Sequence, residues 1–122
     1  MARGFKMGGS GGRFKFDLQA YTGQLGDYSG YMYFDASLYS KVHLGTYKKP
    51  SPDDYIDIFV LGKNASDTSY TTIYTTSKTG SSSGNINDDV DISNYELIQI
   101  RIKSYSNYLT MSNIYIKDCY IE

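Results

Sequence analysis

Apolar and polar residues alternate strictly along several stretches of this chain, the longest of which runs from Tyr31 to Leu44. Successive side chains of a β-strand point to opposite faces, so a period of two predicts a strand with one buried face. Residues 31–44 are long for a single strand. They predict either one long bent strand or two strands with a break near 35–37. The other predicted strands cover residues 13–21, 55–61, 70–76, 96–103 and 109–121. The last is either a plain strand or a strand with a bulge, because the apolar parity changes between Met111 and Ile114.

The pattern predicts about seven or eight strands separated by turns, with no substantial helix. The composition agrees, because fourteen Tyr stand against only two Glu and helix formers are scarce. We expect an all-β protein in which two antiparallel sheets pack face to face as a β-sandwich. A jelly roll is the leading topology and a small barrel is the alternative.

A chain of 122 residues predicts one domain, which we place at residues 13–122. Residues 1–12 are rich in glycine and predict a flexible N-terminal segment. Two interpretations stay open: a linker left from cloning or a disordered tail, or a native arm that docks Phe5 and Met7 into a neighbouring subunit. The single cysteine, Cys119, excludes an intramolecular disulfide.

The net charge is −1, and Lys48–Lys49 is the only adjacent pair of basic residues. This argues against nucleic acid as a partner, because phosphate binding needs a basic patch. No segment resembles a signal peptide or a transmembrane helix. We therefore expect no membrane association, and a location in a virion or in the cytoplasm before assembly. The low net charge permits self-association into a homo-oligomer.

Two runs in the last third of the chain resemble known modules. Residues 90–102, VDISNYELIQIRI, are similar to the turn and central strand of jelly-roll domains of the carbohydrate-binding kind, and residues 111–121 are similar to their closing strand. Modules of this shape also occur in tail and baseplate proteins of bacteriophages. The resemblance implies the fold. It transfers no ligand site, because the chain lacks the tryptophan that commonly forms the sugar platform in such modules.

These observations predict a non-enzymatic structural or binding module, of the kind found in phage or prophage virions as a tail or baseplate protein. It would act through contacts with other proteins or with copies of itself. The alternative is a carbohydrate-binding module that uses surface tyrosines to bind a cell-surface glycan.

The candidate binding residues are Tyr31, Tyr33, Tyr39 and His43, which share one parity of the long alternating stretch. The opposite parity is aliphatic and must face the core. An exposed row of tyrosines could pair across strands to stabilise the sheet, could contact a protein, or could stack on sugars.

Cofactors are not expected, and neither is catalysis. The oxygen-bearing residues Asn87, Asp89 and Asp91 alternate as calcium ligands can, but the glycine and glutamate that complete a calcium loop are missing. We therefore predict no metal and keep these three residues as weak Ca²⁺ candidates. No motif joins the one His to the one Cys, and no nucleophile elbow or phosphate loop is present.

Overall fold

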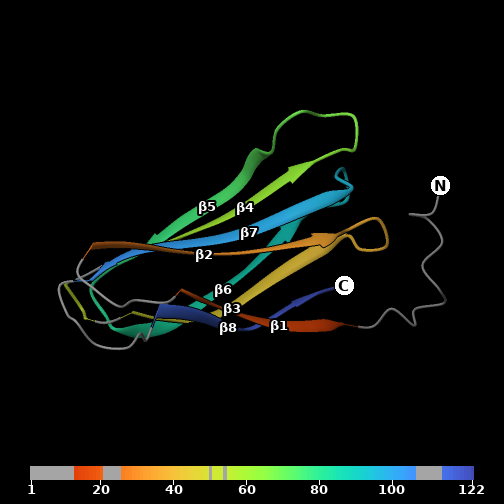
Figure 1. The fold of residues 1–122 in the computed structure, drawn as a ribbon. Helices are drawn as coiled ribbons and strands as arrows, with labels where there is room; N and C mark the ends of the chain where they lie inside the picture. The colour runs from red at the N-terminus through yellow and green to blue at the C-terminus, as the bar shows by residue number, and fades with distance from the viewer. Residues whose placement is uncertain (1–12, 21–25, 50, 54, 107–113) are drawn as a thin grey trace.

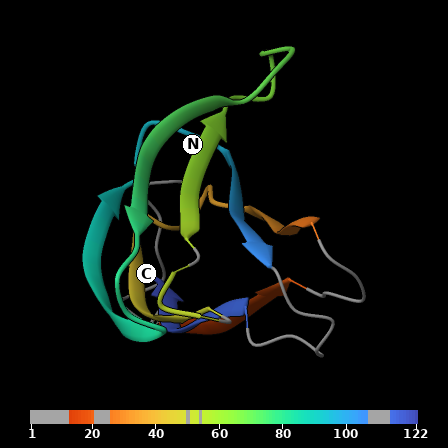
Figure 2. The same ribbon diagram turned by 90° about the vertical axis from the view of Figure 1, so that its left-hand side faces the viewer.

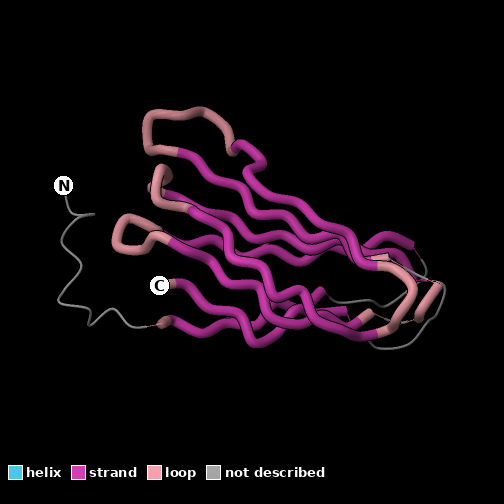
Figure 3. Tube along the Cα trace, turned by 180° about the vertical axis from the view of Figure 1, so that it is seen from behind, coloured by secondary structure: helices cyan, strands magenta, loops and turns pink. Residues whose placement is uncertain are grey.

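The computed structural model describes residues 13–20, 26–49, 51–53, 55–106 and 114–122. The predicted N-terminal segment 1–12 lies outside the described residues, as does the turn around 107–113. The described residues form eight strands and no helix (Figure 3). The strands are β1 (Phe14–Ala20), β2 (Gly26–Asp35), β3 (Lys41–Lys48), β4 (Ile56–Lys63), β5 (Thr71–Lys78), β6 (Ser83–Asp91), β7 (Leu97–Ser106) and β8 (Ile114–Ile121).

The strands form two four-stranded sheets, in which every pairing is antiparallel. Sheet I has the order β1-β8-β3-β6, and sheet II has the order β2-β7-β4-β5. Figure 1 shows the two sheets facing each other, and Figure 2 shows that the loop between β4 and β5 projects away from them. This strand order is that of a jelly roll, so the predicted sandwich and its topology are confirmed.

The chain crosses from one sheet to the other at almost every connection, since only β4 and β5 are consecutive neighbours in a sheet. The longest alternating stretch contains one such crossing. Its first part is the end of β2 in sheet II, and its second part begins β3 in sheet I. The buried residue Ala36 lies in the connection. Of the two interpretations of this stretch, two strands with a break is the correct one.

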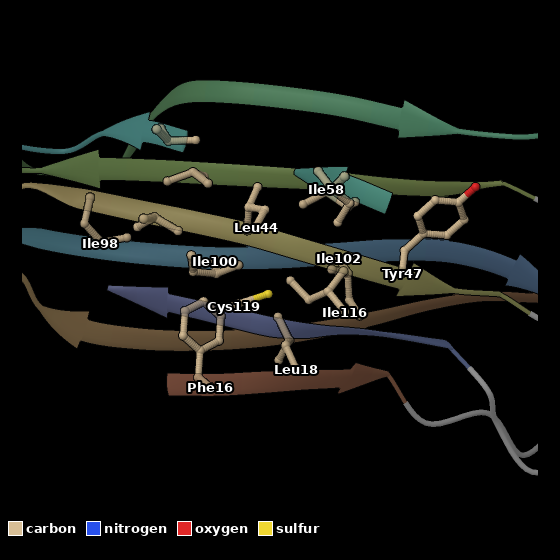
Figure 4. Packing of buried hydrophobic residues seen from close by; sticks show 14 of the residues in the cluster. Phe16, Leu18, Leu44, Tyr47, Ile58, Ile98, Ile100, Ile102, Ile116 and Cys119 are labelled. Carbon is tan, nitrogen blue, oxygen red and sulfur yellow. The ribbon is translucent and has the colours of Figure 1, made fainter. Parts of the chain in front are cut away.

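The core fills the space between the sheets with one continuous cluster of side chains, and Figure 4 shows its centre. Ile98, Ile100 and Ile102 are fully buried in β7, as their alternation predicts. In β8 the buried residues are spaced differently, because a bulge separates Ile116 from Cys119. The bulge that was predicted from the change of parity before Ile114 falls outside the described residues, and the observed bulge lies further along, where Cys119 and Ile121 change parity again.

Three boundaries differ most from the predicted ones. Residues 77–87 lie between predicted strands, yet β6 begins at Ser83 and pairs with β3. Strand β2 begins at Gly26 and β3 continues to Lys48, on either side of the predicted stretch 31–44. Pairing with a neighbouring strand explains all three, because ladder hydrogen bonds can hold residues of low strand propensity. Leu38, which was expected in the core, is 45% exposed in the connection between the sheets.

Among the described residues there is no helix of the length and hydropathy needed to span a bilayer.

Candidate functional site

A row of aromatic and cationic side chains crosses the outer face of sheet II. The pairing register aligns Tyr31 of β2 with Arg101 of β7, and Arg101 with Phe59 of β4. The guanidinium carbon of Arg101 lies 5.5 Å from the centre of the Tyr31 ring and 5.4 Å from that of Phe59. The cation is therefore held between two rings that come from the strands on either side of it.

A second row lies two residues further along each strand. Tyr33 is aligned with Gln99, whose amide Nε2 donates a hydrogen bond of 3.2 Å to the Tyr33 hydroxyl. The ring of Tyr33 also lies 6.1 Å from the ring of Tyr70, at an angle of 54°. Although Tyr33 is 61% exposed and Tyr31 is 50% exposed, contacts on the sheet hold both in place. This face presents two accessible aromatic rings on a rigid support.

The outer face of sheet I carries a different arrangement, centred on Tyr120 of β8. The imidazole of His43 stacks on the Tyr120 ring with centres 4.7 Å apart. The guanidinium of Arg13 lies 4.2 Å from the centre of the same ring. His43 Nδ1 is 2.7 Å from Asp89 Oδ1, and Arg13 Nε is 3.2 Å from Glu122 Oε1. His43 and Arg13 therefore each have two partners, the Tyr120 ring and a carboxylate.

These contacts shift the titration of the groups on sheet I. The hydrogen bond with His43 lowers the pKa of Asp89. The hydrogen bond from Lys41 lowers the pKa of Glu122, and Arg13 adds to this effect. The same hydrogen bond to Glu122 raises the pKa of Lys41. All three shifts favour the charged forms, as expected in a network of opposite charges.

The structure separates the four candidate binding residues. Tyr31 and Tyr33 lie together on the outer face of sheet II. His43 lies on the outer face of sheet I, on the opposite side of the sandwich. Tyr39 lies in the connection between the sheets, where its half-buried side chain packs against the core. The expectation of one shared surface is wrong, because the chain changes sheets within the stretch that carries these residues.

Two of the three weak calcium candidates are engaged in other contacts. Asp89 is paired with His43 and Lys41, and Asp91 accepts hydrogen bonds from the backbone and hydroxyl of Ser93. Asn87 has a φ of 53° in strand β6. The described part of the chain contains no group of three or more His, Cys, Asp or Glu side chains that could hold a metal ion.

His43 and Cys119 do not form a catalytic pair. They lie on neighbouring strands, but His43 faces outward while the Cys119 side chain is 1% exposed within the core. Burial raises the pKa of the Cys119 thiol to about 11, so the thiolate is scarce at neutral pH. A surface hollow of about 580 Å³ lies nearby. Its lining residues are Arg13, Lys15, Phe16, Asp17, Asp118, Cys119 and Tyr120.

Sequence reasoning missed the residues that complete the sheet II face. Arg101 and Gln99 were assigned only to the polar side of their strand. Phe59 and Tyr70 come from other predicted strands, and nothing local links them to Tyr31. Knowledge of the strand order would have found them, because the register places all of them beside β2.

Comparison with known proteins identifies the fold. No family model matches the sequence, and no curated protein matches it either. A solved structure described as "CBM4 structure and function" is similar with a TM-score of 0.50 and 12% identity over 78% of this chain. The chain spans 60% of the length of that protein.

Two further structures are similar with lower TM-scores. A chitosan-binding module 1 from a chitosanase/glucanase of Paenibacillus sp. IK-5 has a TM-score of 0.41 and 16% identity, and the match covers 99% of this chain and 83% of that one. A CBM32 of AlyQ, in complex with 4,5-unsaturated mannuronic acid, has a TM-score of 0.39 and 16% identity over 79% and 76% of the two chains. At 12% identity, the likeness to the CBM4 structure shows the fold of this chain and not its ligand.

Proposed function

We propose that this protein is a non-catalytic carbohydrate-binding module, and that the outer face of sheet II is its binding surface. The observation that carries the proposal is the pair of exposed rings of Tyr31 and Tyr33. They lie on the same face of one strand, about 7 Å apart along it. A tyrosine ring offers an apolar surface to the apolar face of a sugar and a hydroxyl for hydrogen bonds.

The surroundings of the two rings support this function. Gln99 holds the Tyr33 hydroxyl, and the register places the Arg101 side chain beside Tyr31. Sugar sites combine such apolar platforms with a few fixed polar groups that set orientation. Because the rings are already held in place, binding costs little side-chain entropy. The fold neighbour described as a carbohydrate-binding module adds support from architecture.

The absence of tryptophan, which argued against this function at the level of sequence, does not remove the platform. Two tyrosines on adjacent outward positions supply comparable aromatic area. The role in a phage virion and the self-association stay predictions, since neither the fold nor the comparisons bear on them.

The test is affinity electrophoresis of the protein against a panel of soluble polysaccharides. We expect retardation by at least one polysaccharide. Tyr33→Ala and Tyr31→Ala should each weaken the binding by about tenfold or more. The matched control is Tyr115→Ala, which removes a tyrosine from the outer face of sheet I, where it contacts Lys117. Retardation by no polysaccharide, or an equal loss in the Tyr115 variant, would overturn the proposal.

A further inference from the structure

Two features together distinguish Arg101 from the other described cations: it is flanked by two rings, those of Tyr31 and Phe59, and one of its nitrogens is buried. No carboxylate of the described residues lies within ion-pair distance of it. Its buried Nε makes no hydrogen bond to any described group, which costs free energy. The residue as a whole is half-buried, and its charge has no described counter-charge.

The same face carries two lysines and two carboxylates. Lys103 follows Arg101 on the outer side of β7, and Lys63 of β4 lies 5.5 Å from the ring centre of Tyr70. Asp57 is aligned with Lys103 in the strand register, and Asp35 lies at the end of β2. Neither carboxylate is aligned with Arg101, so the charge at the centre of this face is positive and has no described counter-charge.

We propose that the glycan recognised by sheet II carries carboxylates, as chains of uronic acids do, and that Arg101 binds the carboxylate. This inference rests on the proposed function and deepens it by naming the class of sugar. The planar guanidinium can donate two parallel hydrogen bonds to a carboxylate. The rings beside it are placed to pack against the sugar ring that bears that group. A neutral sugar would satisfy the rings and leave the cation unpaired.

The rings also strengthen the contact with the carboxylate. Tyr31 and Phe59 restrict the side chain of Arg101, so less rotamer entropy is lost when the carboxylate binds. They also exclude water from part of the guanidinium, which strengthens its electrostatic attraction to an anion. Tyr33, in the next row, is placed to stack on the neighbouring sugar unit of a chain.

The experiment measures binding of polygalacturonate, alginate and hyaluronan oligosaccharides by calorimetry, each beside its carboxyl-reduced form, which has the same backbone without the charge. We expect at least one acidic form to bind about tenfold or more tightly than its reduced form. Arg101→Gln should abolish this preference, because it should weaken binding of the acidic form about tenfold more than binding of the reduced form. Arg101→Lys should retain part of it, because a lysine keeps the charge and loses the paired geometry.

The control is Lys117→Gln, which removes a cation that lies 4.6 Å from a tyrosine ring centre on the opposite face. It should leave both affinities unchanged, and all variants should melt within a few degrees of the parent. Equal loss in the Arg101 and Lys117 variants would mean general charge attraction and would overturn the inference.

The two proposals fail in different ways. If neutral forms bind as well as acidic ones and Tyr33→Ala weakens both, the inference on acidic sugars is wrong and the proposed function stands. If neither the acidic and reduced chains nor any neutral polysaccharide binds, both are wrong.

Discussion

On the outer face of sheet I, the cations that contact the Tyr120 ring all have carboxylate partners: Arg13 and Lys41 pair with Glu122, and Lys41 is also 3.7 Å from Asp89. On the outer face of sheet II, Arg101 contacts two rings and no described carboxylate. The two faces are built from similar residue types, aromatic and basic, on the same kind of sheet. They differ in whether the protein itself supplies the counter-charge.

The difference concerns these two clusters, since Lys117 on sheet I also contacts a ring and has no ion pair among the described residues. Around Tyr120 the ring, the cations and the carboxylates are partners of one another, so we expect their contacts to contribute to folding stability. Around Tyr31 the arginine has two rings and no described carboxylate. The comparison teaches that similar aromatic and basic residues can carry their own counter-charge on one face and lack it on the other.

The largest expected effect concerns the backbone that supports the sheet I face. Gly45 lies where β3 meets the bulge of β8, and a Cβ there would lie 2.3 Å from the carbonyl oxygen of Asp118. In sheet II, a Cβ on Gly62 would lie 2.6 Å from Cγ of Tyr95, at the base of that ring, so the whole ring has to shift. We expect Gly45→Ala to lower the free energy of unfolding by about 3 kcal/mol.

Gly62→Ala is the matched variant in sheet II and should cost less, about 1 to 2 kcal/mol, because a side chain can shift where a carbonyl of the strand backbone cannot. Urea denaturation followed by tyrosine fluorescence measures both. A Gly62 variant that is the less stable of the two would show that the bulge is not the rigid support of the sheet I face.

The next effect compares one tyrosine on each face. Tyr120→Ala removes the ring that His43, Arg13 and Lys41 contact, so we expect it to lower the free energy of unfolding by about 1 to 2 kcal/mol. Tyr33→Ala should change it by less than about 0.5 kcal/mol, because that ring is mostly in water. The same denaturation experiment checks both values. Equal losses would contradict the assignment of sheet I to stability and sheet II to binding.

The smallest effect is the pH dependence contributed by the sheet I network. The pKa values of Asp89 and Glu122 are lowered in the folded protein from ordinary values of 3.8 and 4.5. Their contribution is therefore fully present above the ordinary values and is lost as the pH falls through the lowered ones. The raised pKa of Lys41 keeps its contribution present below about 10.5, and it fades only above that pH.

We expect Asp89→Asn and Glu122→Gln each to reduce the loss of stability between about pH 5 and pH 2, measured by thermal melting. High salt should shrink the difference between variant and parent, since these groups are exposed. An unchanged acid dependence in both variants would show that the network contributes nothing measurable to the fold.

Much of the fold followed from the alternation of residues. The period of two identified β7 and β4 closely, because a strand buried on one face must repeat its apolar residues at every second position. It did not identify β6, in which Ile86 and Val90 are buried four residues apart. There the inward position between them is taken by Asp88, whose carboxylate accepts a hydrogen bond from Tyr74 of the other sheet. Pairing across the core, which leaves no local signal, makes that polar position tolerable.

The candidate site was only half predictable. Tyr31 and Tyr33 were identified from their parity, and the structure places them on one exposed face. Arg101 was not identified, because its importance comes from the rings on both sides of it, which belong to β2 and β4. Those strands are neighbours of β7 only through the jelly-roll order.

The sequence by itself determined which side chains face inward and which face outward. That assignment survives the crossing from β2 to β3, because both inner faces point to the same core and the parity continues from Phe34 through Ala36 to Val42. Only Leu38 and Tyr39, in the connection itself, depart from it. The tertiary structure alone decided which outward residues are neighbours. When the chain crosses between the sheets, the same set of side chains keeps facing the core, but the other set comes to face the opposite surface of the molecule. Tyr33 therefore lies on one surface and His43 on the other.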